Sequence, residues 1–336
     1  FKFYKILFFN MMVTGTLVAI SSYSWFSMWI GLEINLLSII PLISNPNNLY
    51  PSESALKYFI TQAMASSVLL FSIIMMMNST EFAPKNSSYF MMMMMNSALF
   101  TKMGAAPFHL WFPEVMEGMN WNNCLIMLTW QKIAPMILLM YTSKMTLFFT
   151  SVIIFSTIIG GIQGMNQTSM RKIMAYSSIN HIGWMIASMI GTQNIWMIYF
   201  SIYSIITMNI VLILKQLNIY QMKQLIQSLS SSKILKLMFI LNFLSLGGLP
   251  PFLGFFPKWI TINNMTSNNF FMLSVILIIF TLVTLFFYMR MTFSTLTINY
   301  SENLMNKNKA SLFQIFLFNL TSLSGLLICT SIFNFN

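Results

Sequence analysis

The sequence predicts an all-α, polytopic membrane protein of about eleven transmembrane helices, with two inverted five-helix repeats and two discontinuous helices. Of its 336 residues, 57% are hydrophobic and only 7% are charged, whereas about a quarter of the residues of a soluble domain are charged. Its apolar stretches run for about 18 to 28 residues, and about 20 suffice for a helix to cross a bilayer. Barrel strands would be about ten residues long with alternating polarity, which these stretches lack, so helices are predicted.

The predicted spans follow one another along the chain, separated by short polar joints. The first five are 3–20, 23–43, 52–77, 90–118 and 122–141, the next five are 146–164, 172–190, 194–214, 234–266 and 270–290, and the last is 312–333. The fourth and ninth spans are too long for one straight crossing. We therefore expect a first unit at 1–145, a second unit at 146–292, and a loop with a final helix at 293–336.

The distribution of Lys and Arg predicts the orientation, since positively charged loops stay on the side where the chain is made. With eleven crossings, only Lys85 and Lys144 fall on the side opposite the N-terminus. The residues on the N-terminal side are Lys2, Lys5, Arg171, Lys172, Lys215, Lys223, Lys233, Lys236, Arg290, Lys307 and Lys309. The net charge of +11 thus mainly reflects the orientation of the chain in the membrane. A nucleic-acid partner is excluded, because it would need a basic face on a soluble module.

Three charged residues, Glu33, Lys102 and Lys132, fall near the middle of apolar spans. A position ten residues into a helix lies roughly 15 Å deep, where one charge costs about 2.5 to 3.5 kcal/mol. We therefore expect these side chains to face each other or water. A static buried pair is the alternative. The excess of Lys over Glu favours a proton relay, because desolvation and like charge favour the neutral form of a buried lysine.

An internal repeat marks the two long spans. Gly104, Pro107, Phe108, Phe112 and Pro113 recur at the same spacing as Gly248, Pro251, Phe252, Phe256 and Pro257. Proline removes a helical hydrogen bond, so each copy predicts a helix broken within the membrane. The copies are five spans apart, which predicts an inverted repeat of the kind that surrounds an ion pathway. Two unrelated kinked helices would not explain five matched positions.

Five motif blocks carry a resemblance to a known family. They are Gly31–Asn35, Lys102–Glu114, Trp130–Pro135, Ser177–Trp184 and Leu249–Trp259. Together they resemble the antiporter-like subunits of respiratory complex I, in the short form found in animals. The resemblance implies a core subunit of an H⁺-translocating NADH:ubiquinone reductase in the mitochondrial inner membrane. The N-terminus would face the matrix and the C-terminus the intermembrane space.

The resemblance also implies roles for individual residues. Glu33 would pair with Lys102, Lys132 would be the central relay lysine, and Lys258 would be the terminal site on the second broken helix. His181 lies between the two halves and is expected to bridge Lys132 and Lys258, although a structural histidine is an equal alternative. For His109, which follows the first break, the structural role is favoured.

The same resemblance assigns the redox chemistry to other chains. NADH, FMN, iron–sulfur clusters and ubiquinone are expected elsewhere in the complex, with no cofactor or metal bound here. The expected partners are the other membrane-arm subunits and inner-membrane phospholipid. The basic stretch 215–236 is expected on the matrix surface, against either anionic lipid such as cardiolipin or neighbouring subunits.

Three other functions compete with this prediction. A stand-alone cation/proton antiporter would need its own acidic cation site, and the chain contains no Asp. A haem oxidoreductase would need paired axial histidines, but His109 and His181 lie on spans far apart in the sequence. A structural subunit without a pumping role would keep its lysines only as relics. Cys124 and Cys329 are both expected to be buried free thiols, with a disulfide between them as the alternative.

Overall fold

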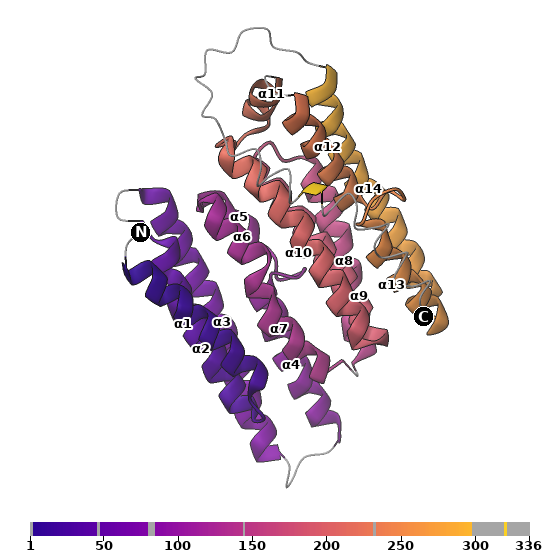
Figure 1. The fold of residues 1–336 in the computed structure, drawn as a ribbon. Helices are drawn as coiled ribbons and strands as arrows, with labels where there is room; N and C mark the ends of the chain where they lie inside the picture. Colours follow the sequence, from indigo (N-terminus) through magenta and orange to yellow (C-terminus); the bar gives the residue numbers. More distant parts are fainter. Residues whose placement is uncertain are drawn as a thin grey trace. The chain divides into compact units, whose positions relative to one another are not determined.

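The computed structural model describes residues 3–45, 48–79, 85–143, 145–230, 233–297 and 319–320 (Figure 1). The chain divides into two compact units between Val152 and Ile153. Throughout the described residues the regular structure is helical, and seven helical segments are long and apolar enough to cross a membrane. The predicted last span, 312–333, and Cys329 lie outside the described residues apart from Asn319 and Leu320. The total of eleven spans and the orientation remain predictions.

The first unit is built from seven helices and the start of an eighth. They are α1 (Phe3–Ser21), α2 (Trp25–Ile43), α3 (Leu49–Ser79), α4 (Lys85–Met103), α5 (Trp111–Gly118), α6 (Trp121–Leu128), α7 (Trp130–Tyr141) and α8 (Thr146–Met165). The Ser24 side chain accepts a hydrogen bond from the Ser27 backbone and so begins α2. Helix α3 contacts α2, α4 and α5, while α7 contacts α1 and α4. These contacts bring the predicted charged residues of the unit to its interior.

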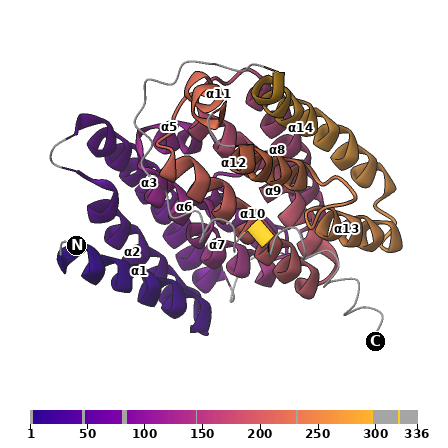
Figure 2. The ribbon, with the colours of Figure 1, turned by 45° about the horizontal axis from the view of Figure 1, so that its top comes forward.

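In its described residues, the second unit contains the rest of α8 and six further helices. They are α9 (Met170–Gly191), α10 (Gln193–Gln216), α11 (Met222–Ser230), α12 (Lys233–Gly247), α13 (Phe255–Ser267) and α14 (Phe271–Thr297). Helix α9 contacts α10, α13 and α14 and buries most of its residues. Figure 2 shows α9 lying behind α12 within this unit. His181 is therefore held by a mostly buried helix, and Lys258 lies on α13, which contacts that helix.

Both long predicted spans are broken in the structure, between α4 and α5 and between α12 and α13. A third break, which the sequence did not predict, divides the span 122–141 at Thr129. The Thr129 hydroxyl donates to the Leu125 carbonyl at 2.7 Å, and the next helix restarts with a bond from the Lys132 N–H to the Thr129 carbonyl. The Thr129 N–H also bonds to the Leu125 carbonyl, and Pro135 inside α7 has no N–H with which to continue the helical hydrogen bonds just beyond the break.

Basic residues of the second unit gather at the end that carries α11. An isolated bridge joins Ser169 to Gln221 and ties the segment before α9 to the segment before α11. The Arg171 guanidinium lies 4.6 Å from the Tyr220 ring centre, and Arg290 donates to a backbone carbonyl at the end of α8. The predicted stretch 215–236 thus includes a short helix at a basic end of its unit, and what covers it remains a prediction.

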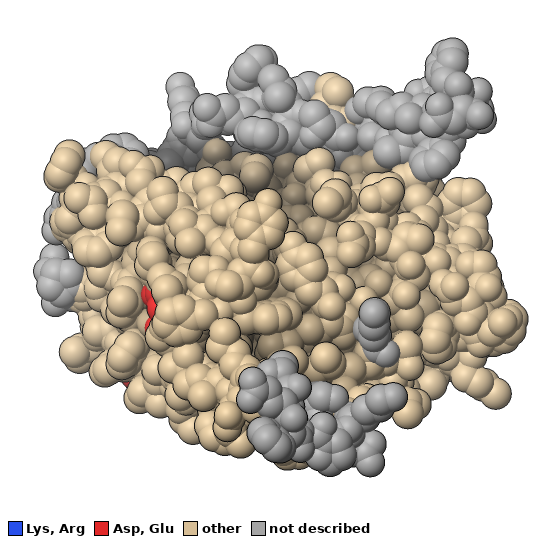
Figure 3. All heavy atoms as spheres, turned by 90° about the horizontal axis from the view of Figure 1, so that it is seen from below, with Lys and Arg blue, Asp and Glu red and all other residues tan. Residues whose placement is uncertain are grey.

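Large apolar side chains are exposed along α3 and α14, as expected for helices that face lipid rather than water. Figure 3 shows a face on which no described Lys or Arg is visible and only a small acidic area interrupts the uncharged surface. This distribution agrees with the low charge content of the chain. It supports a membrane setting without determining which side each end faces.

The closest helix packing in the first unit gives a prediction about stability. A Cβ atom on Gly31 would lie 2.5 Å from the Ala19 backbone nitrogen, whereas one on Gly161 would have no neighbour closer than 3.5 Å. We expect Gly31→Ala to lower stability by about 1 to 3 kcal/mol, because α1 and α2 must separate. Thermal unfolding of the solubilised complex measures this, with Gly161→Ala as the matched control. Equal transition temperatures for the two variants would contradict the predicted close approach.

Candidate functional site

The two predicted breaks share a left-handed glycine and three backbone hydrogen bonds, but only the first has a cis peptide bond, at Ala106–Pro107. Gly104 and Gly248 have φ angles of 74° and 81°, in the left-handed region that glycine adopts readily. Three hydrogen bonds from a backbone N–H to a carbonyl recur at equivalent positions. In the first break they join Gly104 to Thr101, Ala105 to Phe100 and Phe112 to His109. In the second they join Gly248 to Ser245, Leu249 to Leu244 and Phe256 to Leu253. The repeat in the sequence is therefore accompanied by a repeat in local structure. The inverted relation of the two units remains a prediction.

Lys102 is buried in the first unit, and Glu33 is partly buried. Glu33 lies near the middle of α2, and Lys102 lies in the last turn of α4. They interact electrostatically, yet no direct ion pair joins them, and the Oε1 atom of Glu33 is buried without a hydrogen-bond partner. The structure thus brings the two predicted partners near each other but leaves them out of direct contact. Their functional coupling remains a prediction.

A small cavity lies beside Lys102. Its volume is about 10 Å³, which is about the space that one water molecule needs. It is lined by Leu32, Asn35, Leu36, Tyr58, Gln62, Lys102, Gln131 and Pro135. Asn35 and Gln131 exchange two side-chain hydrogen bonds of 3.0 and 2.9 Å across the wall, and Gln62 donates to the Lys102 carbonyl at 3.4 Å. The cavity is polar enough to hold a water next to the ammonium group.

Lys132 is 1% exposed and is the third residue of α7, directly after the break at Thr129. Its ammonium nitrogen lies 5.7 Å from the centre of the Phe112 ring, which belongs to the first broken helix. A cation at this distance from an aromatic face is stabilised by about 0.5 to 2 kcal/mol. Lys132 does not line the cavity at Lys102, but the preceding residue, Gln131, does.

Lys258 closes the second break. Its ammonium donates to the carbonyl oxygens of Gly247 at 2.8 Å and Leu246 at 3.4 Å, which are the last carbonyls of α12. A cation is favourable there because the C-terminal end of a helix is electronegative. The equivalent residue of the first repeat, Glu114, is instead exposed and forms an ion pair with Lys57. Lys258 is therefore both a buried cation and a hydrogen-bond donor to the broken helix.

The first break obtains its donors from uncharged side chains. The Trp111 indole N–H donates to the Thr101 carbonyl at 3.0 Å, and Gln62 supplies the bond to the Lys102 carbonyl. Because these donors are neutral, the Lys102 ammonium is not needed to satisfy the helix end. His109, in the same loop, has its Nδ1 atom 3.3 Å from the Pro107 carbonyl. This contact agrees with the structural role favoured for that histidine.

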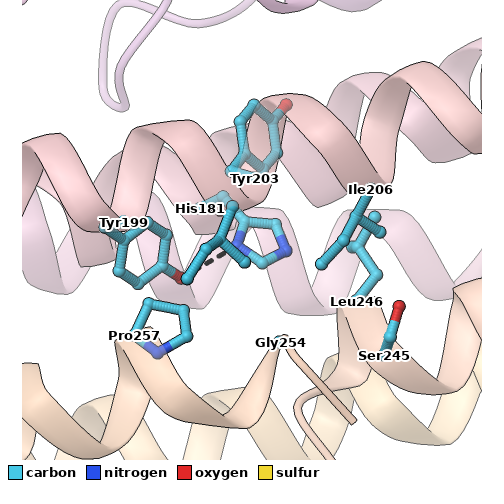
Figure 4. A pocket seen from close by; sticks show the side chains of 9 residues that line it. His181, Tyr199, Tyr203, Ile206, Ser245, Leu246, Gly254 and Pro257 are labelled. Atoms are coloured by element: carbon cyan, nitrogen blue, oxygen red, sulfur yellow. Dashed lines mark hydrogen bonds between the residues drawn. The ribbon is translucent and has the colours of Figure 1, made fainter. Parts of the chain in front are cut away.

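His181 lies on α9 beside a second cavity of about 10 Å³ (Figure 4). The cavity is lined by His181, Tyr199, Ile202, Tyr203, Ile206, Ser245, Leu246, Gly254 and Pro257. The His181 Nδ1 atom and the Tyr199 hydroxyl are 2.9 Å apart, and the Tyr203 ring centre is 5.1 Å from the imidazole. Since Leu246 also accepts a hydrogen bond from Lys258, His181 is near the second break. A bridge from His181 to Lys132 would join the two units and remains a prediction.

Several residues around the lysines were missed by sequence reasoning. Asn35 and Gln131 stand next to predicted residues within motif blocks, so the motifs could have suggested them. Tyr58 and Gln62 lie four residues apart on α3, and this spacing places two polar side chains on one helix face. In the described part of the chain, no three His, Cys, Asp or Glu residues lie close enough to bind a metal, and Cys124 is a buried free thiol.

Comparison with known proteins identifies similar chains. Residues 22–284 match the family described as NADH:quinone oxidoreductase/Mrp antiporter, TM. The chain is 48% identical to NADH-ubiquinone oxidoreductase chain 2 of Anopheles gambiae and 47% identical to that of Aedes aegypti, and each comparison covers 97% of both chains. A chain of respiratory complex I from Thermus thermophilus has a TM-score of 0.87 at 21% identity, covering 96% of this chain and 78% of that one. This last similarity concerns the fold.

The carbonyl contacts of Lys258 give a prediction for the second break. We expect Lys258→Met to destabilise the break by about 1 to 3 kcal/mol, because the buried carbonyls of α12 lose a donor. Faster hydrogen exchange of the backbone around residues 247–258 in the assembled complex would report this loss. Glu114→Gln is the matched control, since an exposed ion pair contributes at most about 1 kcal/mol. Unchanged exchange in Lys258→Met would show that its hydrogen bonds do not hold the break.

Proposed function

The chain belongs to the NADH:quinone oxidoreductase/Mrp antiporter family, and from this premise we propose that Glu33, Lys102, Lys132, His181 and Lys258 carry protons through it. It is a subunit of NADH-ubiquinone oxidoreductase, respiratory complex I, which couples NADH-to-ubiquinone electron transfer to proton translocation. As a multi-pass member of that complex it resides in the mitochondrial inner membrane. NADH, FMN, iron–sulfur clusters and ubiquinone belong to other subunits in this proposal.

One observation carries the proposal: each buried lysine lies within one turn of a helix break. Lys102 directly precedes the first break, Lys132 follows the break at Thr129, and Lys258 follows the second predicted break. Lys102 and Lys258 are 7% exposed and Lys132 is less exposed still. Breaks release backbone carbonyls and make room for water, so a nearby lysine can keep hydrogen-bond partners in both of its protonation states.

In the proposed mechanism, quinone reduction elsewhere in the complex changes the charge at one end of the series. In response, the electrostatic interaction between Glu33 and Lys102 strengthens or weakens. A proton then moves from Lys102 through Lys132 to Lys258. His181, with the Tyr199 hydroxyl beside it, serves the last transfer. Moving one charge against 100 mV costs about 2.3 kcal/mol. Charges buried in a low-dielectric interior interact strongly, so a change of about 2.3 kcal/mol in the interaction between two of them is modest.

The proposed setting follows from the family and the charge distribution. Neighbouring membrane-arm subunits would cover part of the exposed apolar surface, and inner-membrane phospholipid the rest. The basic end of the second unit, with α11, would face the matrix, where anionic headgroups attract Lys and Arg. The N-terminus would lie on that same side, and the C-terminus on the side of the intermembrane space. The two units would be related as inverted repeats around the proton path.

Replacing the central lysine tests the relay. We expect Lys132→Met in the assembled complex to slow proton translocation by about tenfold or more, because a positioned proton carrier is lost. Proton uptake per NADH oxidised, measured in sealed vesicles, reports the change. Lys57→Met is the control, since it removes a lysine whose ion pairs are exposed. Unchanged translocation by an assembled Lys132→Met complex would leave only the structural-subunit alternative.

A further inference from the structure

We propose that Tyr58 is a proton-carrying residue of the first unit, whose hydroxyl and one water in the adjoining cavity connect Lys102 with Glu33. This inference rests on the proposed function and adds to it a group outside all five motif blocks. It explains how Glu33 and Lys102 exchange a proton although no ion pair joins them in the structure.

The position of the Tyr58 ring is determined by the first break. The ring is 4% exposed and packs edge-on against Trp111, with 5.8 Å between the ring centres. Trp111 is itself held by the hydrogen bond from its indole to the Thr101 carbonyl, one residue before Lys102. Packing therefore places the Tyr58 ring independently of its hydroxyl. The hydroxyl is free to serve another purpose.

The hydroxyl has no hydrogen bond to any side chain or carbonyl in the described part of the chain, although the residue lines the cavity with Lys102. Buried tyrosine hydroxyls usually have a partner. A water in the cavity of about 10 Å³ would supply that partner and would also accept from the Lys102 ammonium. The cavity thus offers a one-water connection between the two side chains.

We assign the other end of this connection to Glu33, a partly buried carboxylate of the same unit. It interacts electrostatically with both Tyr58 and Lys102, and its Oε1 atom is buried without a hydrogen bond. The remaining polar side chains of the cavity, Asn35, Gln131 and Gln62, are amides that already hydrogen-bond to other groups. Amides do not readily gain or lose a proton. Tyr58 is therefore the only lining residue besides Lys102 that can pass one on.

The transfer balances without any further reactant. The Lys102 ammonium gives a proton to the water, and the water gives one of its own to the Tyr58 oxygen. Once the Glu33 side chain turns to within hydrogen-bond distance of Tyr58, the Tyr58 hydroxyl proton moves to the Glu33 carboxylate. Lys102 and Glu33 end neutral, while the water and the tyrosine regain their starting forms. Reversal of the three steps restores both charges.

Removal of the hydroxyl alone tests the proposal. We expect Tyr58→Phe in the assembled complex to slow proton translocation by about tenfold and to alter its solvent deuterium isotope effect, because one proton-transfer step is interrupted. The ring and its contact with Trp111 remain, so assembly should be normal. Tyr50→Phe is the matched control, since Tyr50 lies on the same helix but is 78% exposed. Translocation in Tyr58→Phe equal to that in Tyr50→Phe would overturn the role of Tyr58.

A second variant blocks the same connection and leaves Tyr58 intact. Leu36 lines the cavity from α2, and Leu36→Phe would fill the space that the water requires. We expect the same slowing as in Tyr58→Phe, and normal translocation by the assembled Leu36→Phe complex would contradict the water connection. This variant decides the question if Tyr58→Phe does not assemble.

Lysine variants separate this inference from the function on which it rests. If Tyr58 acts through Lys102, the double variant Tyr58→Phe, Lys102→Met translocates no more slowly than Lys102→Met alone. Additive losses would place Tyr58 outside this path. Normal translocation in both Lys102→Met and Lys132→Met would contradict both the proposed relay and the role of Tyr58. Slow translocation in the lysine variants with normal translocation in Tyr58→Phe would contradict only the role of Tyr58.

Discussion

The need to satisfy the backbone carbonyls of broken helices governs the arrangement of both units. In an apolar medium an unpaired carbonyl is costly, so each break must find its donors within the protein. The first break uses the neutral side chains of Trp111 and Gln62, and the second uses the ammonium of Lys258. Two breaks that share a left-handed glycine and three backbone hydrogen bonds are therefore completed by different side chains.

This difference decides what each buried lysine is able to do. Lys102 is not required at the end of its helix, so its ammonium can face a cavity and respond to Glu33. Lys258 is bonded to the end of α12, and any change in its protonation acts directly on the break. Lys132 is positioned by the unpredicted break at Thr129 and by the ring of Phe112. The two units are thus similar in backbone but distinct in how their charges are held.

Sequence reasoning succeeded where a local rule applies. The long apolar stretches predicted helices because lipid allows few other backbone structures, and the glycine and proline repeat predicted two breaks because those residues restrict or free the dihedrals around them. It did not predict the break at Thr129, since a threonine within an apolar helix usually leaves the helix intact. It expected Glu33 to pair with Lys102, but whether two side chains touch depends on how α2 and α4 are spaced.

By itself, the sequence determined that the chain is a helical membrane protein, where its two glycine-proline breaks lie, and that Lys102 and Lys132 are buried. Those properties depend on composition and on neighbours within a few residues. Only the tertiary structure decided what surrounds each charge. Asn35 meets Gln131 from 96 residues away, and Tyr58 and Lys102 line the same cavity, to which four helices contribute. Such contacts arise from close packing between distant segments, which no local pattern encodes.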